Sequence, residues 1–246
     1  MTAYSTKDEA QFISASMDVL RRYGVSLTLG NDFDEYRDLL AQGRPDHVLG
    51  EPFDPKLHDL GQKNAVWIIG RDADRVIMHT QALRLLDIGT RSLGEFLHKG
   101  FRKFPPSGLD IDFRRSRFRV GPGAQTITGK VCYHGEVWMG GFPGQFRGSG
   151  LSSILGRFAF LTAIQSWNPD YVFGFMPKPV AYKGFVERQG YMHTEPGSLR
   201  WYIKGQDTPI EGFLAYMSAQ DMRYVLGMSV SDMVKDPIKK SSEEAA

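Results

Sequence analysis

Residues 140–155 are GGFPGQFRGSGLSSIL, a stretch that holds five glycines in its first eleven residues and then becomes apolar. Residues 126–139, just before it, have the composition of a strand pair or one long strand, and Leu151–Trp167 has apolar residues at helical spacing. A helix N terminus has unpaired N–H groups and a partial positive charge, which attract anions. Glycines allow close backbone approach, and Arg147 adds a charged donor. The stretch therefore predicts a site for phosphate or pyrophosphate.

The two commonest nucleotide motifs do not fit this stretch. The dinucleotide fingerprint G-x-G-x-x-G fails because Ser153 stands at the position of the third glycine. The P-loop requires Gly-Lys-Ser/Thr, and these residues contain no lysine. A different phosphate-binding loop is required.

The segment RGSGLS, Arg147–Ser152, resembles the acyl-CoA pyrophosphate loop of the GNAT superfamily of N-acyltransferases, with the pattern Q/R-x-x-G-x-G/A. Two registers fit. The first, from Gln145 to Gly150, matches every letter. The second, from Arg147 to Ser152, has serine in place of glycine or alanine but starts the helix at Leu151, and we favour it.

The flanking sequence extends the resemblance. A strand precedes the loop, a helix and a second strand follow it, and FVERQGYMH at 185–193 is similar to the family's ending before its sixth strand. The resemblance covers 130–205 well and 60–90 loosely. It implies an α/β fold of the α+β type, with a mixed, mostly antiparallel sheet, flanking helices and a splay between the fourth and fifth core strands.

The resemblance also implies the donor, which is acetyl-CoA or another acyl-CoA. Its pantetheine arm would lie in the splay against the backbone around Trp138–Gly141, and its pyrophosphate would bind the N–H groups of Arg147–Ser152. The expected donor-binding residues are Trp138, Met139, Gly141, Gln145, Arg147, Gly148, Ser149, Gly150, Leu151 and Ser152.

The strand before the loop offers candidates for a general base. Cys132, His134 and Glu136 should alternate onto one face of that strand. Acyl transfer to an amine needs a neutral amine, a polarised carbonyl and a proton for the leaving thiolate. Glu136 is our first choice for the base and His134 our second, whereas a solvated or salt-bridged carboxylate is the alternative for Glu136. The outer two residues stand about 13 Å apart on a strand, too far for one ion, so we expect no metal.

The general acid is less clear. The family's usual tyrosine lies four residues before the glycine of its Gly-Phe/Tyr pair, and Val186 occupies that position here. Tyr182 lies one helical turn earlier and is our candidate acid, with a packing role as the alternative. The substitution at Val186 also favours a second hypothesis, a non-catalytic sensor or interaction module that binds an acyl-CoA or a nucleotide.

The remaining sequence predicts one domain over 1–246. We expect an N-terminal helical lead at 1–60, an acyltransferase core at 60–205 with an insertion at 91–125, and a C-terminal helical tail at 206–246. Within the core we expect a hairpin formed by Ala65–Ile69 and Val76–Leu86, one helix over 178–191 and a last strand over 198–204. The lead and the insertion are candidates for the acceptor pocket.

Composition and net charge argue against several classes of protein. The hydrophobic fraction of 41% and the charged fraction of 24% are those of a globular protein, and a net charge of +2 is too small to argue for nucleic acid. The arginines of residues 114–120 fit a solvated edge strand. Cys132 is the only cysteine, and no apolar run is long enough to span a membrane, so we expect a cytoplasmic protein without membrane or nucleic-acid partners. A small-molecule amine is the expected acceptor, while an acyl carrier protein as donor and a homodimer stay open.

Overall fold

The computed structural model describes residues 6–142 and 145–234, and within them eight strands form one sheet. The strands are β1 (Ser26–Gly30), β2 (Ala65–Arg71), β3 (Ile77–Gly89), β4 (Arg117–Phe118), β5 (Gly129–Met139), β6 (Tyr171–Pro177), β7 (His193–Trp201) and β8 (Ile210–Ser218). The helices are α1 (Thr6–Arg22), α2 (Phe33–Gly43), α3 (Leu93–Gly100), α4 (Pro122–Thr126), α5 (Leu151–Trp167), α6 (Lys178–Ala181), α7 (Phe185–Gln189) and α8 (Ala219–Leu226). The described residues also form three short 3-10 helices: η1 (Glu51–Phe53), η2 (Phe101–Lys103) and η3 (Val230–Asp232).

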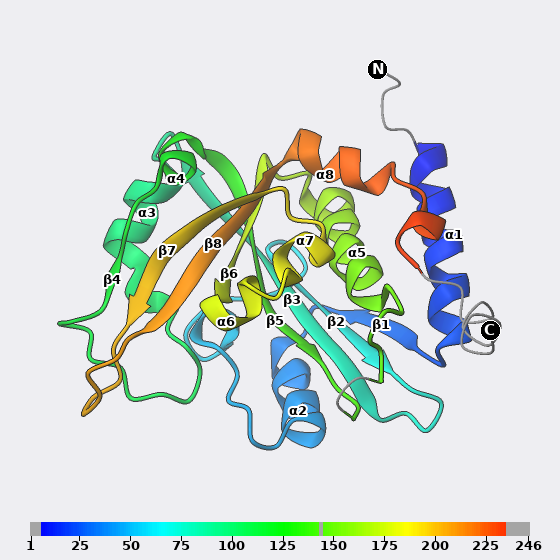
Figure 1. Ribbon diagram of the computed structural model, residues 1–246, viewed down its shortest axis with the longest axis horizontal. Coiled ribbons are helices and arrows are strands. Elements are labelled where there is room, and N and C mark those ends of the chain that lie inside the picture. Colours follow the sequence, from blue (N-terminus) through cyan, green and yellow to red (C-terminus); the bar gives the residue numbers. More distant parts are fainter. Residues whose placement is uncertain (1–5, 143–144, 235–246) are drawn as a thin grey trace, which may run out of the picture.

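The sheet has the order β1-β2-β3-β5-β6-β8-β7-β4, and both of its faces are covered (Figure 1). Because side chains alternate along a strand, Cys132 and Val172 pack on the face of α5, while Val131 and Phe173 pack on the face that α3 and η2 cover. Helices α1, α7 and α8 contact α5 on the first face. On the second face α2 and η1 pack over β2 and β3.

The expected splay lies between β5 and β6, the one parallel pair of the sheet in the described part of the chain. Their pairing runs only from Val131 opposite Tyr171 to Tyr133 opposite Phe173. Beyond that point β6 stays paired with β8 as far as Pro177, and β5 stays paired with β3 as far as Met139. The two strands therefore part in the middle of the sheet. The predicted fold class, a mixed and mostly antiparallel sheet with flanking helices, is confirmed.

A bulge interrupts β5 just after the splay begins. Ala82 of β3 lies opposite Gly135, and Thr80 lies opposite Trp138, so β5 has one more residue than β3 in this interval. Glu136 has φ of 55°, in the left-handed region that few non-glycine residues adopt. The hydroxyl of Thr80 donates to the carbonyl of Glu136 at 2.8 Å and satisfies this displaced peptide group.

Several elements match the sequence-based expectations. Helices α1 and α2, the β2–β3 hairpin and β6 lie where the sequence predicts them, and α5 spans Leu151–Trp167 as expected. Residues 126–139 form one long strand, β5, rather than a strand pair. Within the insertion, α3 ends at Gly100 and continues as η2.

Other expectations were wrong. The N-terminal lead is not purely helical, because Ser26–Gly30 forms the edge strand β1. The C-terminal segment is not a helical tail, because Ile210–Ser218 forms β8, which lies between β6 and β7 in the sheet. The strand expected over 198–204 lies earlier, as β7. The single helix expected over 178–191 is two short helices, α6 and α7, and Gly184, with a φ of 70°, caps the start of the second.

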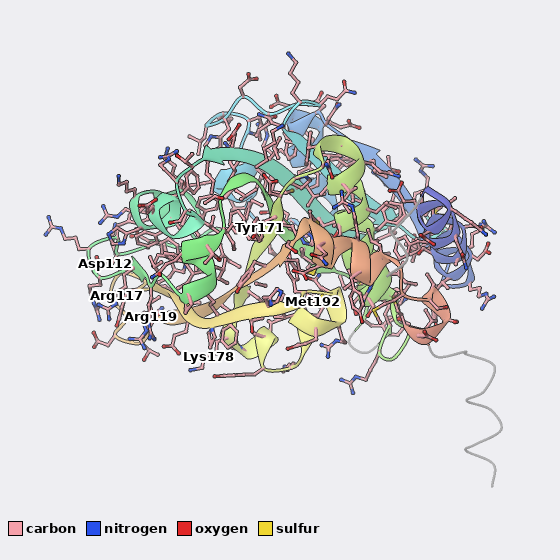
Figure 2. All side chains as sticks on the ribbon, turned by 90° about the horizontal axis from the view of Figure 1, so that it is seen from above. Asp112, Arg117, Arg119, Tyr171, Lys178 and Met192 are labelled. Atoms are coloured by element: carbon pink, nitrogen blue, oxygen red, sulfur yellow. The ribbon has the colours of Figure 1, made fainter. Side chains whose placement is uncertain are left out.

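The arginine-rich segment lies far from the glycine-rich loop. Arg117 and Arg119 flank the buried Phe118 and are exposed at the outer edge strand β4, as Figure 2 shows. Figure 1 shows β4 at the left edge of the molecule and α5 to the right of its centre. Among the described residues, no helix combines the length and apolarity that a bilayer span requires.

Candidate active site

The glycine-rich loop leads into α5 as the sequence predicts. Gly148 and Gly150 have φ of 75° and 76°, so both require the left-handed conformation that glycine adopts readily. Gly150 is the residue that caps α5. Among the described residues, the backbone N–H groups of Gly150 and Ser152 find no hydrogen-bond acceptor. The loop therefore presents free donors at the positive end of a seventeen-residue helix.

A cavity of about 860 Å³ lies in front of these donors, and we call it the cradle. Two exposed arginines line it, Arg147 from the loop and Arg188 from α7, together with one acid, Asp232. The C-terminal segment forms another wall: a Cβ on Gly150 would lie 2.2 Å from the carbonyl oxygen of Met233. The cradle is thus a cationic space beside free N–H groups, suited to an anion.

Most of the expected donor-binding residues line the cradle. They are Met139, Gly141, Gln145, Arg147, Gly148, Gly150 and Ser152. Three others do not. Trp138 packs against α2 and lies under the guanidinium of Arg44, 5.0 Å from its ring centroid. Leu151 is buried against α1, and Ser149 is turned into the loop, where its hydroxyl donates to Phe146 and accepts from Leu151 N–H.

A narrow space leads from the cradle into the splay. It has a volume of about 10 Å³, roughly that needed for one water molecule, and shares Met139, Ser152 and Phe185 with the cradle. The buried His79 lines it. Its Nδ1 lies 2.7 Å from the carbonyl of Trp138 and donates to it, which leaves Nε2 as an acceptor without a partner in the described residues. Burial lowers the pKa of His79 to about 4, so the ring is neutral.

Two larger cavities continue beyond the narrow space. The central cavity, about 310 Å³, is lined by both strands of the splay and shares Val137 and Gln189 with the narrow space. The next cavity, about 200 Å³, shares Tyr133 and Glu136 with the central one. The row of cavities begins on the α5 face and ends on the face that η1 and η2 cover. We call this row the passage.

Glu136 lies where the central cavity meets the last one. Its side chain is only 6% exposed. One carboxylate oxygen accepts from Gly50 N–H at 3.0 Å, and the other lies 2.6 Å from Nε2 of His47 and 3.8 Å from a guanidinium nitrogen of Arg44. The N-terminal lead therefore supplies every partner of this carboxylate. Arg84 fixes the lead to the sheet by donating to the carbonyl of Pro52 at 2.6 Å.

The pair formed by His47 and Glu136 has the chemistry of a proton acceptor. A carboxylate can only accept, so Nε2 of His47 carries the hydrogen of this contact. In the neutral ring Nδ1 then holds a lone pair, and no described residue donates to it. His47 and Arg44 line the central cavity, where the His47 side chain is 23% exposed. A carboxylate that orients an imidazole in this way fixes its tautomer and leaves Nδ1 as the ring atom that could take a proton.

His134, the second candidate base, has a different environment. Nε2 lies 3.1 Å from Oε1 of Gln81, whose amide nitrogen donates to the backbone carbonyl of Leu155. That order fixes the tautomer: Nε2–H donates to Gln81, and Nδ1 accepts from the hydroxyl of Tyr191 at 3.0 Å. The ring is 3% exposed, and burial lowers its pKa to about 3. Both nitrogens are engaged, so His134 has no free lone pair.

The expected alternation of Cys132, His134 and Glu136 on one face was wrong. Cys132 and His134 lie on the α5 face, as expected, but the bulge turns Glu136 to the opposite face, toward Arg44 and His47. The two candidate bases therefore leave β5 on opposite faces, although both line the central cavity. Among the described residues, no cluster of three or more His, Cys, Asp and Glu side chains could hold a metal ion.

The structure does not bring Tyr182 to the passage. This residue follows α6, is 70% exposed and packs edge-on against Phe213, with ring centroids 5.4 Å apart. Val186 is buried in the core beside α5. A different tyrosine, Tyr191, lines the central cavity, where burial raises the pKa of its hydroxyl.

Sequence reasoning missed three site residues, Arg44, His47 and Arg188. The first two fall in a proline-containing stretch that carries no periodicity, and 89 residues separate His47 from its partner. Arg188 lies in the segment used for the resemblance, but no sequence signal marks it as cradle-facing. Only the folded chain assembles these groups.

The chain was compared with known proteins. No family model and no curated protein sequence matches it. It is similar to the solved structure of NAA60 from Arabidopsis thaliana in complex with acetyl-CoA, at 11% identity over 79% of this chain and 98% of that one, with a TM-score of 0.45. It is also similar to spermidine N-acetyltransferase from Vibrio cholerae in complex with CoA and spermine, at 10% identity over 81% and 98% and a TM-score of 0.41. A third is FeeM, an N-acyl amino acid synthase from uncultured soil microbes, at 10% identity over 81% and 93% and a TM-score of 0.42.

Proposed function

We propose that this protein is an acyltransferase that moves an acetyl or other acyl group from acyl-CoA to the amine of a small molecule. One observation carries the proposal: a cationic cradle at a helix N terminus adjoins, through the splay of β5 and β6, a cavity that holds a carboxylate and an oriented imidazole. The cradle suits the phosphates of the donor. The pair of His47 and Glu136 suits the proton that an attacking amine must lose.

The proposed reaction is a direct transfer. The neutral amine attacks the thioester carbonyl, a C–N bond forms and the C–S bond breaks. The amine proton passes to Nδ1 of His47, while Glu136 stabilises the imidazolium through Nε2–H. That proton then reaches the thiolate, directly or through solvent, and the products are an amide and free CoA. No further reactant is needed.

The roles expected from the sequence are thereby redistributed. Glu136 keeps its place in the proton-accepting machinery, now as the group that orients His47. The exposure of Tyr182 supports a packing role against Phe213 rather than that of an acid. His134 and Tyr191 form a hydrogen-bonded network with Gln81 in which both nitrogens of His134 are engaged, and this supports a structural role for both residues. A donor carried by an acyl carrier protein instead of CoA is compatible with the passage, since the pantetheine arm is the same.

The first experiment measures donor binding. Titration calorimetry with acetyl-CoA and with CoA should give a measurable affinity, and Arg147→Glu should weaken it by at least tenfold because the change reverses a charge in the cradle. Arg119→Glu is the matched control, an equal charge change at the exposed edge strand. Equal acetyl-CoA affinity in the unaltered protein, Arg147→Glu and Arg119→Glu would contradict the assignment of the cradle as the donor-binding site. We avoid Gly150→Glu because that side chain would displace Met233 and disturb the fold.

The second experiment measures turnover. Release of free thiol from acetyl-CoA over a panel of amines should identify at least one acceptor whose amide product is seen by mass spectrometry. A non-catalytic acyl-CoA sensor is the second candidate, favoured by Val186, which is buried where the family usually has a tyrosine. Binding of acyl-CoA without thiol release for any amine would support the sensor instead.

A further inference from the structure

The last cavity of the passage has an aromatic wall. Its lining includes five aromatic side chains, Phe53, Phe104, Tyr133, Phe175 and Trp201, and we call it the aromatic compartment. The rings contact one another: Tyr133 lies 5.5 Å from Phe53 and 5.0 Å from Phe104 between centroids. Such rings hold their positions and present a preformed apolar surface.

Among the described residues, no charged side chain that lines the compartment is unpaired. Two carboxylates reach its lining, Glu136 and Glu211. Glu136 is held by the lead, as described above. Glu211 pairs with Lys178 at 2.6 Å and with Arg200 at 3.0 Å; Lys178 is labelled in Figure 2. An ammonium or carboxylate inside the compartment would lose its hydration without gaining a free partner of opposite charge, so the space favours an apolar group.

The adjoining central cavity is different. Arg44, His47 and Glu136 line it and provide the polar groups that an attacking amine needs. Two groups extend from the reacting carbonyl, the acyl tail and the acceptor. The two cavities that meet at Glu136 differ in polarity in the same way: the aromatic compartment suits the apolar tail, and the central cavity suits the polar amine. Burial of methylenes in the aromatic compartment is favourable, whereas their burial against Arg44 and His47 is not.

From this division we infer that the aromatic compartment binds the hydrocarbon tail of the acyl group, so that the preferred donors are acyl thioesters longer than acetyl. The inference rests on the proposed acyl transfer and specifies its donor. The volume of about 200 Å³ is many times the roughly 10–15 Å³ that one water molecule needs by the same measure, so the compartment has room for a hydrocarbon chain.

Two segments outside the family resemblance build the compartment. Phe53 comes from η1 of the N-terminal lead, and Phe104 and Ser107 come from the insertion. A chain that retained only the resembling core would lack these walls. The insertion also offers a place to fill the compartment, because Ser107 is half-buried on its rim and belongs to a loop rather than to a helix or strand.

The test is a binding series with S-acyl pantetheines and acyl-CoAs of increasing length, from acetyl through butanoyl, hexanoyl and octanoyl to dodecanoyl. We expect the dissociation constant to fall by two- to fourfold for each added methylene and to level off once the acyl tail fills the compartment. Ser107→Trp should flatten this dependence while leaving acetyl-CoA affinity within twofold. Leu109→Trp, two residues on and outside the compartment, is the matched control and should keep the dependence.

Each other outcome has a definite meaning. Equal affinity for acetyl and octanoyl thioesters in the unaltered protein would overturn the inference. A Ser107→Trp variant that weakens the binding of acetyl and octanoyl thioesters equally would also overturn it. A Ser107→Trp variant that changes only the KM of the amine would overturn it too, because the compartment would then belong to the acceptor. If acyl pantetheines show the length dependence but CoA does not bind, the compartment stands and the CoA cradle fails. If neither bare CoA nor any thioester binds, the proposed function and the inference both fail.

Discussion

His134 and Glu136 are two residues apart on one strand, yet their surroundings are opposite. His134 faces α5, where its two nitrogens are engaged by Gln81 and Tyr191 and burial keeps it neutral. Glu136 faces the N-terminal lead, where it orients His47 beside an open cavity. The two ring nitrogens of His134 are both engaged, whereas the pair of His47 and Glu136 keeps a free lone pair on Nδ1 of His47. Chemistry with a substrate requires such a free lone pair.

A single extra residue creates this difference. Without the bulge, Glu136 would follow His134 onto the α5 face, among Leu155 and Phe160. The bulge also coincides with the end of β5–β6 pairing at Tyr133, so the strand turns its carboxylate at the point where the sheet opens. Backbone conformations as uncommon as that of Glu136 persist when the surrounding structure fixes them, and they concentrate at functional sites.

The largest expected effect comes from the open side. Glu136→Gln keeps the shape and the bond from Gly50 N–H but removes the charge that stabilises the His47 imidazolium. We expect kcat to fall by about 10²- to 10⁴-fold, with the dissociation constant of acyl-CoA within twofold. The measurement is thiol release with the best amine of the panel. Glu51→Gln, an exposed neighbour in η1, is the control. An unchanged kcat would remove the pair from the mechanism.

A smaller effect should follow from removal of the imidazole. His47→Ala should lower kcat by about 10- to 100-fold, because water beside the retained Glu136 carboxylate can partly replace the base in an open cavity. Added imidazole should restore part of the lost rate, since the deleted ring leaves space beside Glu136. His98→Ala, at an exposed position, should lose no activity and show no rescue. A His47→Ala protein that loses activity but is not rescued, and that unfolds at lower temperature, would indicate a structural role.

The open side is also where sequence reasoning failed, while the cradle could be predicted. Gly150 and the helical spacing after it are local signals, and they placed the start of α5 at Leu151. Cys132, His134 and Glu136 also follow a local rule, alternation, but the bulge that breaks it depends on how β5 pairs with β3. β8 was missed because a short apolar run such as IEGFLAYMS does not itself distinguish a strand from a helix.

The two buried histidines on the α5 face, His79 and His134, should make the stability of the fold depend on pH. His79 and His134 have folded pKa values of about 4 and about 3, below the unfolded value of about 6.5. Below pH 6.5 these two histidines bind protons in the unfolded chain but stay neutral in the folded chain. The free energy of unfolding therefore decreases as pH falls toward 4. Each histidine should cost on the order of 2 kcal/mol between pH 6.5 and 5. Urea unfolding at a series of pH values measures this, and His134→Gln should reduce the slope where the exposed His98→Gln does not. An unchanged slope would contradict the hydrogen-bonded network of His134.

The smallest effect concerns the bulge that separates the two sides. Thr80→Val is isosteric, yet it removes the hydroxyl that donates to the carbonyl of Glu136 and accepts from Arg44 at 3.2 Å. Because a buried carbonyl is left without its donor, we expect a loss of about 1–2 kcal/mol in the free energy of unfolding and a several-fold fall in kcat. Thr162→Val is the control: its hydroxyl donates to Phe158 of α5, a carbonyl within the hydrogen-bonded ladder of the helix, so its loss should cost less. If both variants cost the same and kcat is unchanged, the hydroxyl of Thr80 does not hold Glu136 in place, and the bulge is fixed by the pairing of β3 and β5 alone.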